Sequence, residues 1–283
     1  MSKKTGGPSR IQPEFHERIW GREDLAPLFP GSPAGKRIGE VWFHTPGTLL
    51  VKFLFTSERL SVQVHPDDAY AERHHGSLGK TEAWYVVDAQ PPGEVAVGFR
   101  QTLTRERLKE VAQTGEIEQL LDWRRVKPGD VIFVPAGTVH AIGAGLTLCE
   151  IQENSDITYR LYDYGRPREL HLEHGVLVAE LGPHRAEAQR RQLEEWREEL
   201  LVCPYFRIER LQPRGSLRFD AGCPFYRILI CIRGSGRIAN ESFCAGEAWL
   251  LAADQEEFVL EGAGSEWILT YTAQERVEGI REV

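Results

Sequence analysis

The stretch Gly129-Asp-Val-Ile-Phe-Val-Pro-Ala-Gly-Thr-Val-His140 decides the fold of this chain. A glycine turn leads into four apolar residues, which have the length and composition of a buried strand. Pro135 and Gly137 then favour a tight turn, because proline fixes its φ angle and glycine tolerates a positive one. The stretch therefore predicts a strand and a turn that present His140 at the strand end.

This stretch has the form G-x5-P-x-G-x2-H, which is the second signature of the cupin barrel. Ala144 replaces the asparagine that usually follows four residues after the histidine. The first cupin signature places two ligands two residues apart, as in Ser61-Val-Gln-Val-His65. Alternate residues of a strand point to one face, so Gln63 and His65 can both enter one barrel interior.

These signatures predict a metal site. Glu82 opens another apolar strand, and strands that are distant in sequence can point side chains at one centre of a barrel. Gln63, His65, Glu82 and His140 would supply two imidazole nitrogens and two oxygen ligands. Such a set suits one Zn²⁺ per chain, with Fe²⁺ or Mn²⁺ as alternatives. A lone histidine is more often structural, but two histidines in two signature patterns favour the metal.

The rest of the chain reads as mainly β. Glycine and proline residues are spread along it and divide it into short apolar segments. Two short helices are expected around Gly115, and an Asp67 cap opens another at Asp68–Arg73. The segments predicted as strands in the first part are Leu49–Phe55, Leu60–Val64, Glu82–Val87, Val95–Phe99, Val131–Val134, Leu146–Ile151 and Ile157–Leu161.

A weak internal repeat suggests two related barrels. Gly246–Glu257 can be laid over Gly129–His140, with Glu257 where the histidine would recur. We expect a double cupin of jelly-roll barrels whose second barrel is degenerate. Leu193, Trp196 and Leu200 have helical spacing. The expected organisation is a flexible tail at 1–9, a metal-binding barrel with short helices at 10–182, a connecting helix at 183–202 and a cupin-like barrel at 203–283.

Composition narrows the class of protein. The 283 residues carry a net charge of −8, which favours neither nucleic acid nor an anionic membrane as a partner. No apolar run approaches the ~20 residues of a membrane span, and the N-terminus lacks the apolar core of a secretory signal. Five cysteines without a C-x-x-C motif indicate reduced thiols and a cytoplasmic protein. A monomer or a homodimer is compatible with the sequence.

Several longer motifs resemble type I mannose-6-phosphate isomerases, in the short bacterial branch of that cupin family. The resemblance covers residues 10–175 and includes flanking motifs at Ile38–Trp42 and Arg168–His171. The motifs that carry it are Leu60–Asp68, Gly79-Lys-Thr-Glu-Ala-Trp-Tyr85, Val126–Asp130 with Pro135–Ala141, and Glu150–Arg166.

The resemblance implies a zinc-dependent interconversion of mannose 6-phosphate and fructose 6-phosphate, with a small phosphosugar as the partner molecule. Gln63, His65, Glu82 and His140 match the metal ligands of the family. Arg160 matches its catalytic arginine, whereas Lys80 and Glu150 match residues that line the same pocket.

The residue chemistry fits this reaction. Aldose–ketose isomerisation moves a proton between C1 and C2 through an enediol(ate), which needs a base, an electrophile and a phosphate grip. Glu150 can act as the base if it points inward; the alternative is a half-exposed strand carboxylate. Arg160 can hold an oxyanion or phosphate, unless it forms a structural ion pair. Lys80 can polarise substrate or bind it, unless it is a loop lysine; Lys52 and Arg166 are further basic candidates.

Two rival functions remain at this point. One is another enzyme on the same scaffold, such as an isomerase of a different sugar or a dioxygenase, although Gln63 fits a dioxygenase poorly. The other is a non-catalytic sugar-binding or regulatory cupin. The retention of Lys80, Glu150 and Arg160 favours catalysis.

Overall fold

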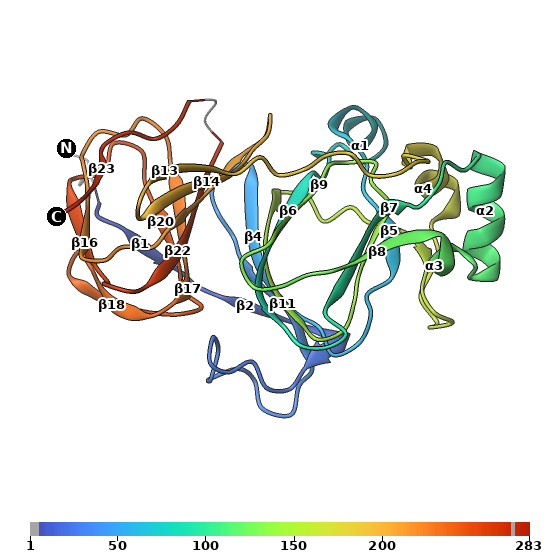
Figure 1. Cartoon of the computed structure of the whole chain (residues 1–283), viewed down its shortest axis with the longest axis horizontal. Coiled ribbons are helices and arrows are strands. Elements are labelled where there is room, and N and C mark those ends of the chain that lie inside the picture. Colours follow the sequence, from blue (N-terminus) through green and yellow to red (C-terminus); the bar gives the residue numbers. More distant parts are fainter. Residues whose placement is uncertain (1–5, 273–274) are drawn as a thin grey trace.

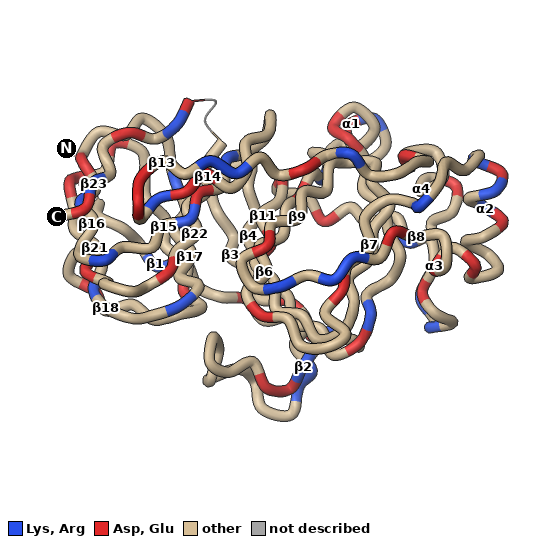
Figure 2. The backbone as a smooth tube through the Cα atoms, viewed as in Figure 1, with Lys and Arg blue, Asp and Glu red and all other residues tan. Residues whose placement is uncertain are grey.

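Antiparallel strands form four sheets, which Figure 1 shows gathered into two barrels. The computed structural model describes residues 6–272 and 275–283. Lys and Arg alternate with Asp and Glu along both barrels (Figure 2). Among the described residues, no helix has the length and apolar character needed to cross a bilayer. The mainly β, double-barrel fold expected from the sequence is confirmed.

The first barrel pairs a six-stranded sheet, β2-β3-β4-β11-β6-β9, with a five-stranded one, β12-β5-β10-β7-β8. The strands of the larger sheet are β2 (Glu14–Arg22), β3 (Ile38–Phe43), β4 (Leu49–Phe55), β11 (Leu146–Glu153), β6 (Glu82–Ala89) and β9 (Val131–Val134). Those of the smaller sheet are β12 (Tyr159–Tyr162), β5 (Val62–Val64), β10 (His140–Ile142), β7 (Glu94–Phe99) and β8 (Leu121–Arg125).

Of the four helices among the described residues, three lie against the outer side of the five-stranded sheet and one lies at the end of the barrel (Figure 1). Asp67 accepts a hydrogen bond from the Tyr70 backbone N–H, as expected for the cap of the first helix. Gly115 has a positive φ and separates the second helix from the third, as predicted. The helices are α1 (Asp68–His75), α2 (Arg105–Thr114), α3 (Ile117–Leu120) and α4 (Leu172–Val178).

The second barrel pairs a seven-stranded sheet, β1-β20-β17-β22-β15-β14-β13, with a five-stranded one, β19-β18-β21-β16-β23. The strands of the larger sheet are β1 (Ser9–Ile11), β20 (Ala248–Leu251), β17 (Arg227–Arg233), β22 (Glu266–Tyr271), β15 (Arg207–Leu211), β14 (Arg197–Val202) and β13 (Arg191–Glu194). Those of the smaller sheet are β19 (Glu241–Cys244), β18 (Ser235–Ile238), β21 (Phe258–Glu261), β16 (Ser216–Phe219) and β23 (Ile280–Glu282).

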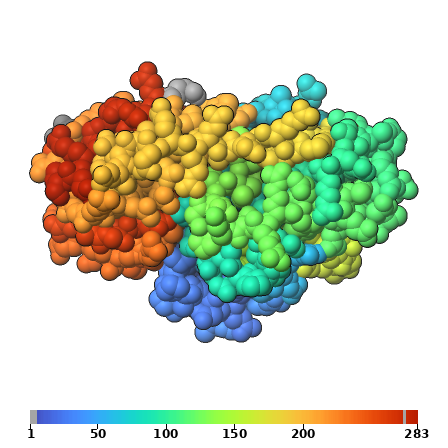
Figure 3. Space-filling model, in the orientation of Figure 1, coloured from blue at the N-terminus to red at the C-terminus, as the bar shows by residue number. Residues whose placement is uncertain are grey.

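The prediction of a connecting helix at 183–202 is wrong. The chain after α4 is extended and crosses from one barrel to the other (yellow in Figure 3), and it ends in the hairpin of β13 and β14. The charged residues of β14 find partners across the sheet: Arg197 Nε lies 2.5 Å from Glu209 Oε2, and Arg207 Nη1 lies 2.8 Å from Glu199 Oε2. These cross-strand pairs outweigh the helical spacing of the apolar residues.

The structure also differs from the predicted domain boundaries on both sides of the first barrel. Residues 1–5 of the predicted tail lie outside the described residues, but Ser9–Ile11 form β1 at the edge of the second barrel. Arg10 holds this strand in place, because its guanidinium lies 3.2 Å from Glu247 and over the ring of Trp249. The second barrel therefore takes strands from both ends of the chain, and its sheet begins at 191 rather than 203.

The two large sheets pack face to face, and this packing orients the site. Phe53 and Ile151 of the first barrel share an apolar cluster with Ile208, Ile228 and Ile230 of the second. Because side chains alternate along a strand, the neighbours of these residues turn the other way, into the barrel interiors. Lys52 and Glu150 are such neighbours, so the burial of one face between the barrels points both of them into the first barrel.

Candidate metal centre and adjoining pocket

Three buried side chains converge inside the first barrel. His65 follows β5, Glu82 is the first residue of β6, and His140 is the first residue of β10. Their ligand atoms all lie within 4.8 Å of one another. His65 Nε2 lies 3.5 Å from Glu82 Oε2, and His140 Nε2 lies 3.4 Å from Glu82 Oε1. Gln63 pairs with His140 in the sheet and places its amide nitrogen 3.2 Å from His140 Nε2.

Backbone carbonyls fix the orientation of both imidazole rings. His65 Nδ1 donates a hydrogen bond to the Ile157 carbonyl at 2.8 Å, and His140 Nδ1 donates one to the Thr138 carbonyl at 2.9 Å. Both Nε2 atoms are therefore left as unprotonated ligands toward Glu82, which is the usual arrangement around a metal. Burial, followed by Lys80, lowers the pKa of His65 to about 3, and burial also lowers the pKa of His140.

Glu82 is a buried carboxylate, and both of its oxygens face the metal-ligand atoms of the two histidines. The ammonium group of Lys80 lies 2.8 Å from Oε2. Burial alone would raise the pKa of Glu82, but Lys80 and His65 outweigh it and hold this pKa well below its usual range. A buried anion whose oxygens face two unprotonated imidazole nitrogens fits a divalent cation, and the mixed nitrogen and oxygen set suits zinc.

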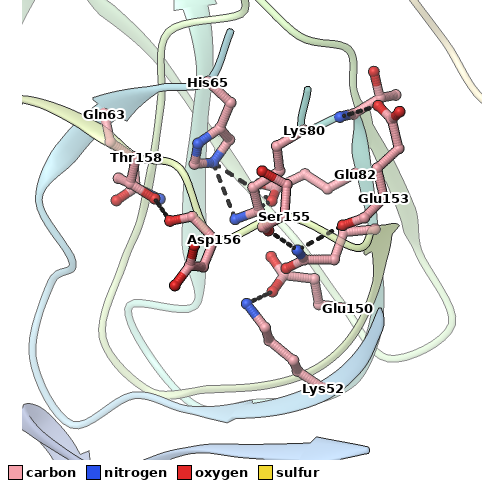
Figure 4. A network of polar contacts seen from close by, with 12 residues as sticks. Lys52, Gln63, His65, Lys80, Glu82, Glu150, Glu153, Ser155, Asp156 and Thr158 are labelled. Carbon is pink, nitrogen blue, oxygen red and sulfur yellow. Dashed lines mark hydrogen bonds and ion pairs between the residues drawn. The ribbon is translucent and has the colours of Figure 1, made fainter. Parts of the chain in front are cut away.

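A pocket of about 450 Å³ opens beside this centre. Five of the residues singled out from the sequence line it: Lys52, Gln63, Lys80, Glu150 and Arg160. Gln63 and Lys80 also contact the histidines, so they join the pocket to the centre. Figure 4 shows Lys80 directed toward His65 and Glu82, with Glu150 and Lys52 on the neighbouring wall.

Glu150 is fixed from two sides. Its Oε2 lies 3.5 Å from the ammonium nitrogen of Lys52, and its Oε1 accepts a hydrogen bond from the Trp84 indole at 3.1 Å. Burial, followed by the charge of Glu82, raises the pKa of Glu150 to about 7. Burial lowers the pKa of Lys52, whose ammonium lies 4.3 Å from the centre of the Trp42 ring. The interior thus holds a fixed carboxylate next to a fixed cation.

Arg160 lies on β12 opposite Gln63 and is half-buried at the pocket. Its Nη1 donates to the Glu169 carbonyl at 2.7 Å, but its Nε has no partner among the described residues. It forms no ion pair with a described carboxylate, so the structural ion pair considered for it is absent from the part of the chain described. Burial, and then Arg168, lowers the pKa of Arg160. A guanidinium group at the pocket without a carboxylate partner among the described residues has donors available for an anion.

The sequence missed part of the pocket wall. Arg18 and Glu40 line it and lie 2.6 Å apart, and Trp42 and Arg168 also contribute. Arg166 does not line it; this residue pairs with Glu58 and donates to the Arg59 carbonyl. The signal for three of these residues was present in the sequence, because Glu40 and Trp42 lie in the flanking motif Ile38–Trp42 and Arg168 begins the flanking motif Arg168–His171.

The fold and the site together define a double cupin with a buried His–Glu–His group that could hold a metal ion, next to a polar pocket. No protein-family model matches the chain. It is 37% identical to the mannose-6-phosphate isomerase ManA of Bacillus subtilis, over 91% of this chain and 97% of that protein. It is 34% identical to the mannose-6-phosphate isomerase of Streptococcus mutans, over 82% of this chain and 86% of that protein.

Solved structures agree with these relatives. The crystal structure of the mannose 6-phosphate isomerase of Bacillus subtilis matches with a TM-score of 0.85 and 28% identity, over 94% of this chain and all of that one. A structure of a mannosephosphate isomerase homologue from Archaeoglobus fulgidus has a TM-score of 0.76 at 19% identity, which shows the shared fold. The chain belongs to the mannose-6-phosphate isomerase family.

Proposed function

We propose that this chain interconverts mannose 6-phosphate and fructose 6-phosphate, with one Zn²⁺ held by His65, Glu82, His140 and the side-chain oxygen of Gln63. The Gln63 amide, whose nitrogen faces His140 in this structure, would turn so that its oxygen faces the metal. The observation that carries the proposal is the pocket in which Gln63 and Lys80 adjoin both the histidine–carboxylate centre and Glu150. The family membership supports the substrate pair, and the donor set supports zinc over Fe²⁺ or Mn²⁺.

Glu150 is the residue best placed to move the proton between C1 and C2. Its carboxylate is buried, lines the pocket, and is held by Trp84 on one oxygen and by Lys52 on the other. A fixed base that takes the proton from one carbon can return it to the adjacent carbon of the same face. The metal supplies a Lewis acid that stabilises negative charge on the sugar oxygens.

Arg160 and Lys80 supply positive charge to a dianionic substrate. Arg160 keeps its Nε free for an acceptor, and Arg168 lies on the same pocket wall. Lys80 is held by Glu82 and points to the centre, so it can donate a hydrogen bond to a substrate oxygen. We assign Arg160 to the phosphate or oxyanion of the substrate, and Lys80 to the sugar oxygens near the reacting carbons.

A coupled assay tests the proposal. Purified chain is stripped with a chelator, reconstituted separately with Zn²⁺, Fe²⁺ and Mn²⁺, and assayed for conversion of mannose 6-phosphate to fructose 6-phosphate. Activity that disappears with the metal and returns with zinc supports it. Folded, zinc-loaded protein that binds the phosphosugar without turnover would identify a non-catalytic sugar-binding cupin instead.

A further inference from the structure

Strand β17 occupies in the second barrel the place that β6 occupies in the first. Strand β6 lies between β9 and β11, and β17 lies between β20 and β22. The first residue of each strand pairs with the last residue of its neighbour: Glu82 with Val134, and Arg227 with Leu251. The second barrel therefore places an arginine where the first barrel places the carboxylate of its metal centre.

The side chain of Arg227 faces the interior of the second barrel. Leu229 and Cys231, which share its face of β17, belong to the apolar core of that barrel. Ile228 and Ile230, on the opposite face, pack against the first barrel. Only 1% of Arg227 is exposed to solvent. Its guanidinium group is therefore removed from water by apolar surroundings.

Two of the three nitrogens of this guanidinium are buried without a partner in the described part of the chain. Its Nε and Nη2 have no hydrogen bond among the described residues, and no carboxylate described in the structure pairs with it. Burial lowers the pKa of Arg227, and only Cys223 and Tyr271 act against this. Tyr271 instead donates its hydroxyl hydrogen to Glu209, whose charge is already matched by Arg197.

A second buried polar side chain lies beside the same segment. Gln255 is 1% exposed, and neither its amide nitrogen nor its amide oxygen has a partner among the residues described. The Gly222 backbone N–H donates to the Gln255 carbonyl, and the Asp254 N–H donates to the Cys223 carbonyl. Cys223 also lies within electrostatic range of Arg227, so the Gly222–Cys223 segment links the backbone at Gln255 to the surroundings of Arg227.

We propose that the second barrel binds a small oxyanion, such as inorganic phosphate or a carboxylate, through Arg227 and Gln255. The two free nitrogens of Arg227 lie along one edge of the guanidinium plane, which is the edge that grips two oxygens of an oxyanion at once. The Gln255 amide adds a donor. A buried cation without a counter-charge is costly, and an oxyanion removes that cost.

Thermal unfolding of the full-length, zinc-loaded chain tests this site. The wild type, Arg227→Met and Arg233→Met are compared in phosphate, acetate and chloride at equal ionic strength. Arg233 is the matched control, since it lies on the same strand but is exposed and paired with Glu266. Phosphate or acetate should raise the Tm of the wild type and of Arg233→Met by at least ~3 °C more than that of Arg227→Met.

Any phosphate bound at the catalytic pocket is common to all three proteins, so the difference isolates Arg227. A response to acetate alone assigns the site to carboxylates, and a response to phosphate alone assigns it to tetrahedral oxyanions. Isomerase turnover is measured in parallel and should be unchanged in Arg227→Met. Loss of the proposed isomerase activity in every protein would leave the Tm comparison intact.

Wild-type crystals grown with selenate supply a test that needs no variant. An anomalous peak along the Nε–Nη2 edge of Arg227 is expected. Equal Tm responses in all three proteins, together with only water at that edge, would overturn the proposal. If Arg227→Met does not fold, Gln255→Leu replaces it, and the same loss of response is expected.

Discussion

Lys52 and Glu150 stand directly opposite each other on β4 and β11, with Lys52 Nζ 3.5 Å from Glu150 Oε2. The pair is buried and faces the pocket rather than the neighbouring barrel. A cation that holds one oxygen of a carboxylate restricts its rotation and leaves it in a single orientation toward the substrate. We therefore include both residues in the proposed active site.

Glu150→Gln should abolish most turnover while leaving the fold intact, because the amide keeps the shape and the Trp84 contact but cannot accept a proton. We expect kcat to fall by about 10²- to 10⁴-fold with a much smaller change in KM. Lys52→Met should lower kcat less. Steady-state kinetics with circular dichroism as the folding control measure this, and a Glu150→Gln enzyme with wild-type kcat contradicts the assignment.

Arg160→Ala should weaken phosphosugar binding, since it removes the partly unsatisfied guanidinium at the pocket. We expect kcat/KM to fall by at least about 10²-fold, which corresponds to one strong charge-assisted contact. Arg166→Ala is the matched control, because Arg166 lies nearby in sequence but pairs with Glu58 outside the pocket. Equal losses in the two variants would argue for a structural effect of both.

The zinc content of single variants should show that the proposed ligands contribute unequally to metal binding. His140→Ala should retain less than a tenth of the zinc of the wild type after dialysis, because it removes an imidazole that nothing else replaces. Gln63→Ala should bind zinc about 10- to 100-fold more weakly yet still load at excess metal. Elemental analysis and competition with a chromogenic chelator measure both. Full zinc retention by His140→Ala would exclude the proposed centre.

Stability should depend on pH through Glu153, whose Oε2 accepts the Thr81 backbone N–H at 2.8 Å. Burial raises the pKa of Glu153 from its ordinary 4.5 to about 7. The folded state therefore binds this proton more tightly than the unfolded state, so the resulting stability is present below pH 4.5 and is lost as the pH rises through 7.

Glu153→Gln removes this titration and keeps an acceptor for Thr81. Relative to the wild type, the variant should gain about 1 kcal/mol in unfolding free energy between pH 5 and pH 8. Urea unfolding at the two pH values measures the difference. If the difference in unfolding free energy between the wild type and Glu153→Gln does not change with pH, the Glu153 carboxyl has the same pKa in the folded and unfolded states.

Sequence analysis predicted those strands and helix ends that depend on short stretches of neighbouring residues. The strand that ends before His65 and the strand that begins at Glu82 follow from apolar runs bounded by turn residues, and the caps of α1 and α2 follow from Asp67 and Gly115. The short strand β10, which begins at His140, was not among the predicted strands. The convergence of His65, Glu82 and His140 required the barrel signatures as well. The order of strands in the sheets depends on long-range pairing that no local pattern contains.

The wrong prediction of a helix at 183–202 and the pocket residues that were not assigned also result from contacts between segments that are distant in the sequence. In β14 the charged residues that suggested a solvated helix are buried and neutralised by partners on β15. Arg18 and Arg168 reach the pocket only because of how β2 and the segment after β12 are placed beside it. Such positions depend on which residue lies across the sheet, so they need the register of the strands as well as their existence.

Strand β1 precedes the first barrel in the sequence but pairs with β20, which follows that barrel. Ser9 pairs with Leu250, and Arg10 lies over Trp249, both on β20. While the ribosome is still translating the first barrel, β1 has no strand to join, and the seven-stranded sheet has an open edge. The first barrel can bring its proposed metal ligands together during this interval. The second barrel can complete its seven-stranded sheet only after β20 has been synthesised and β1 has paired with it.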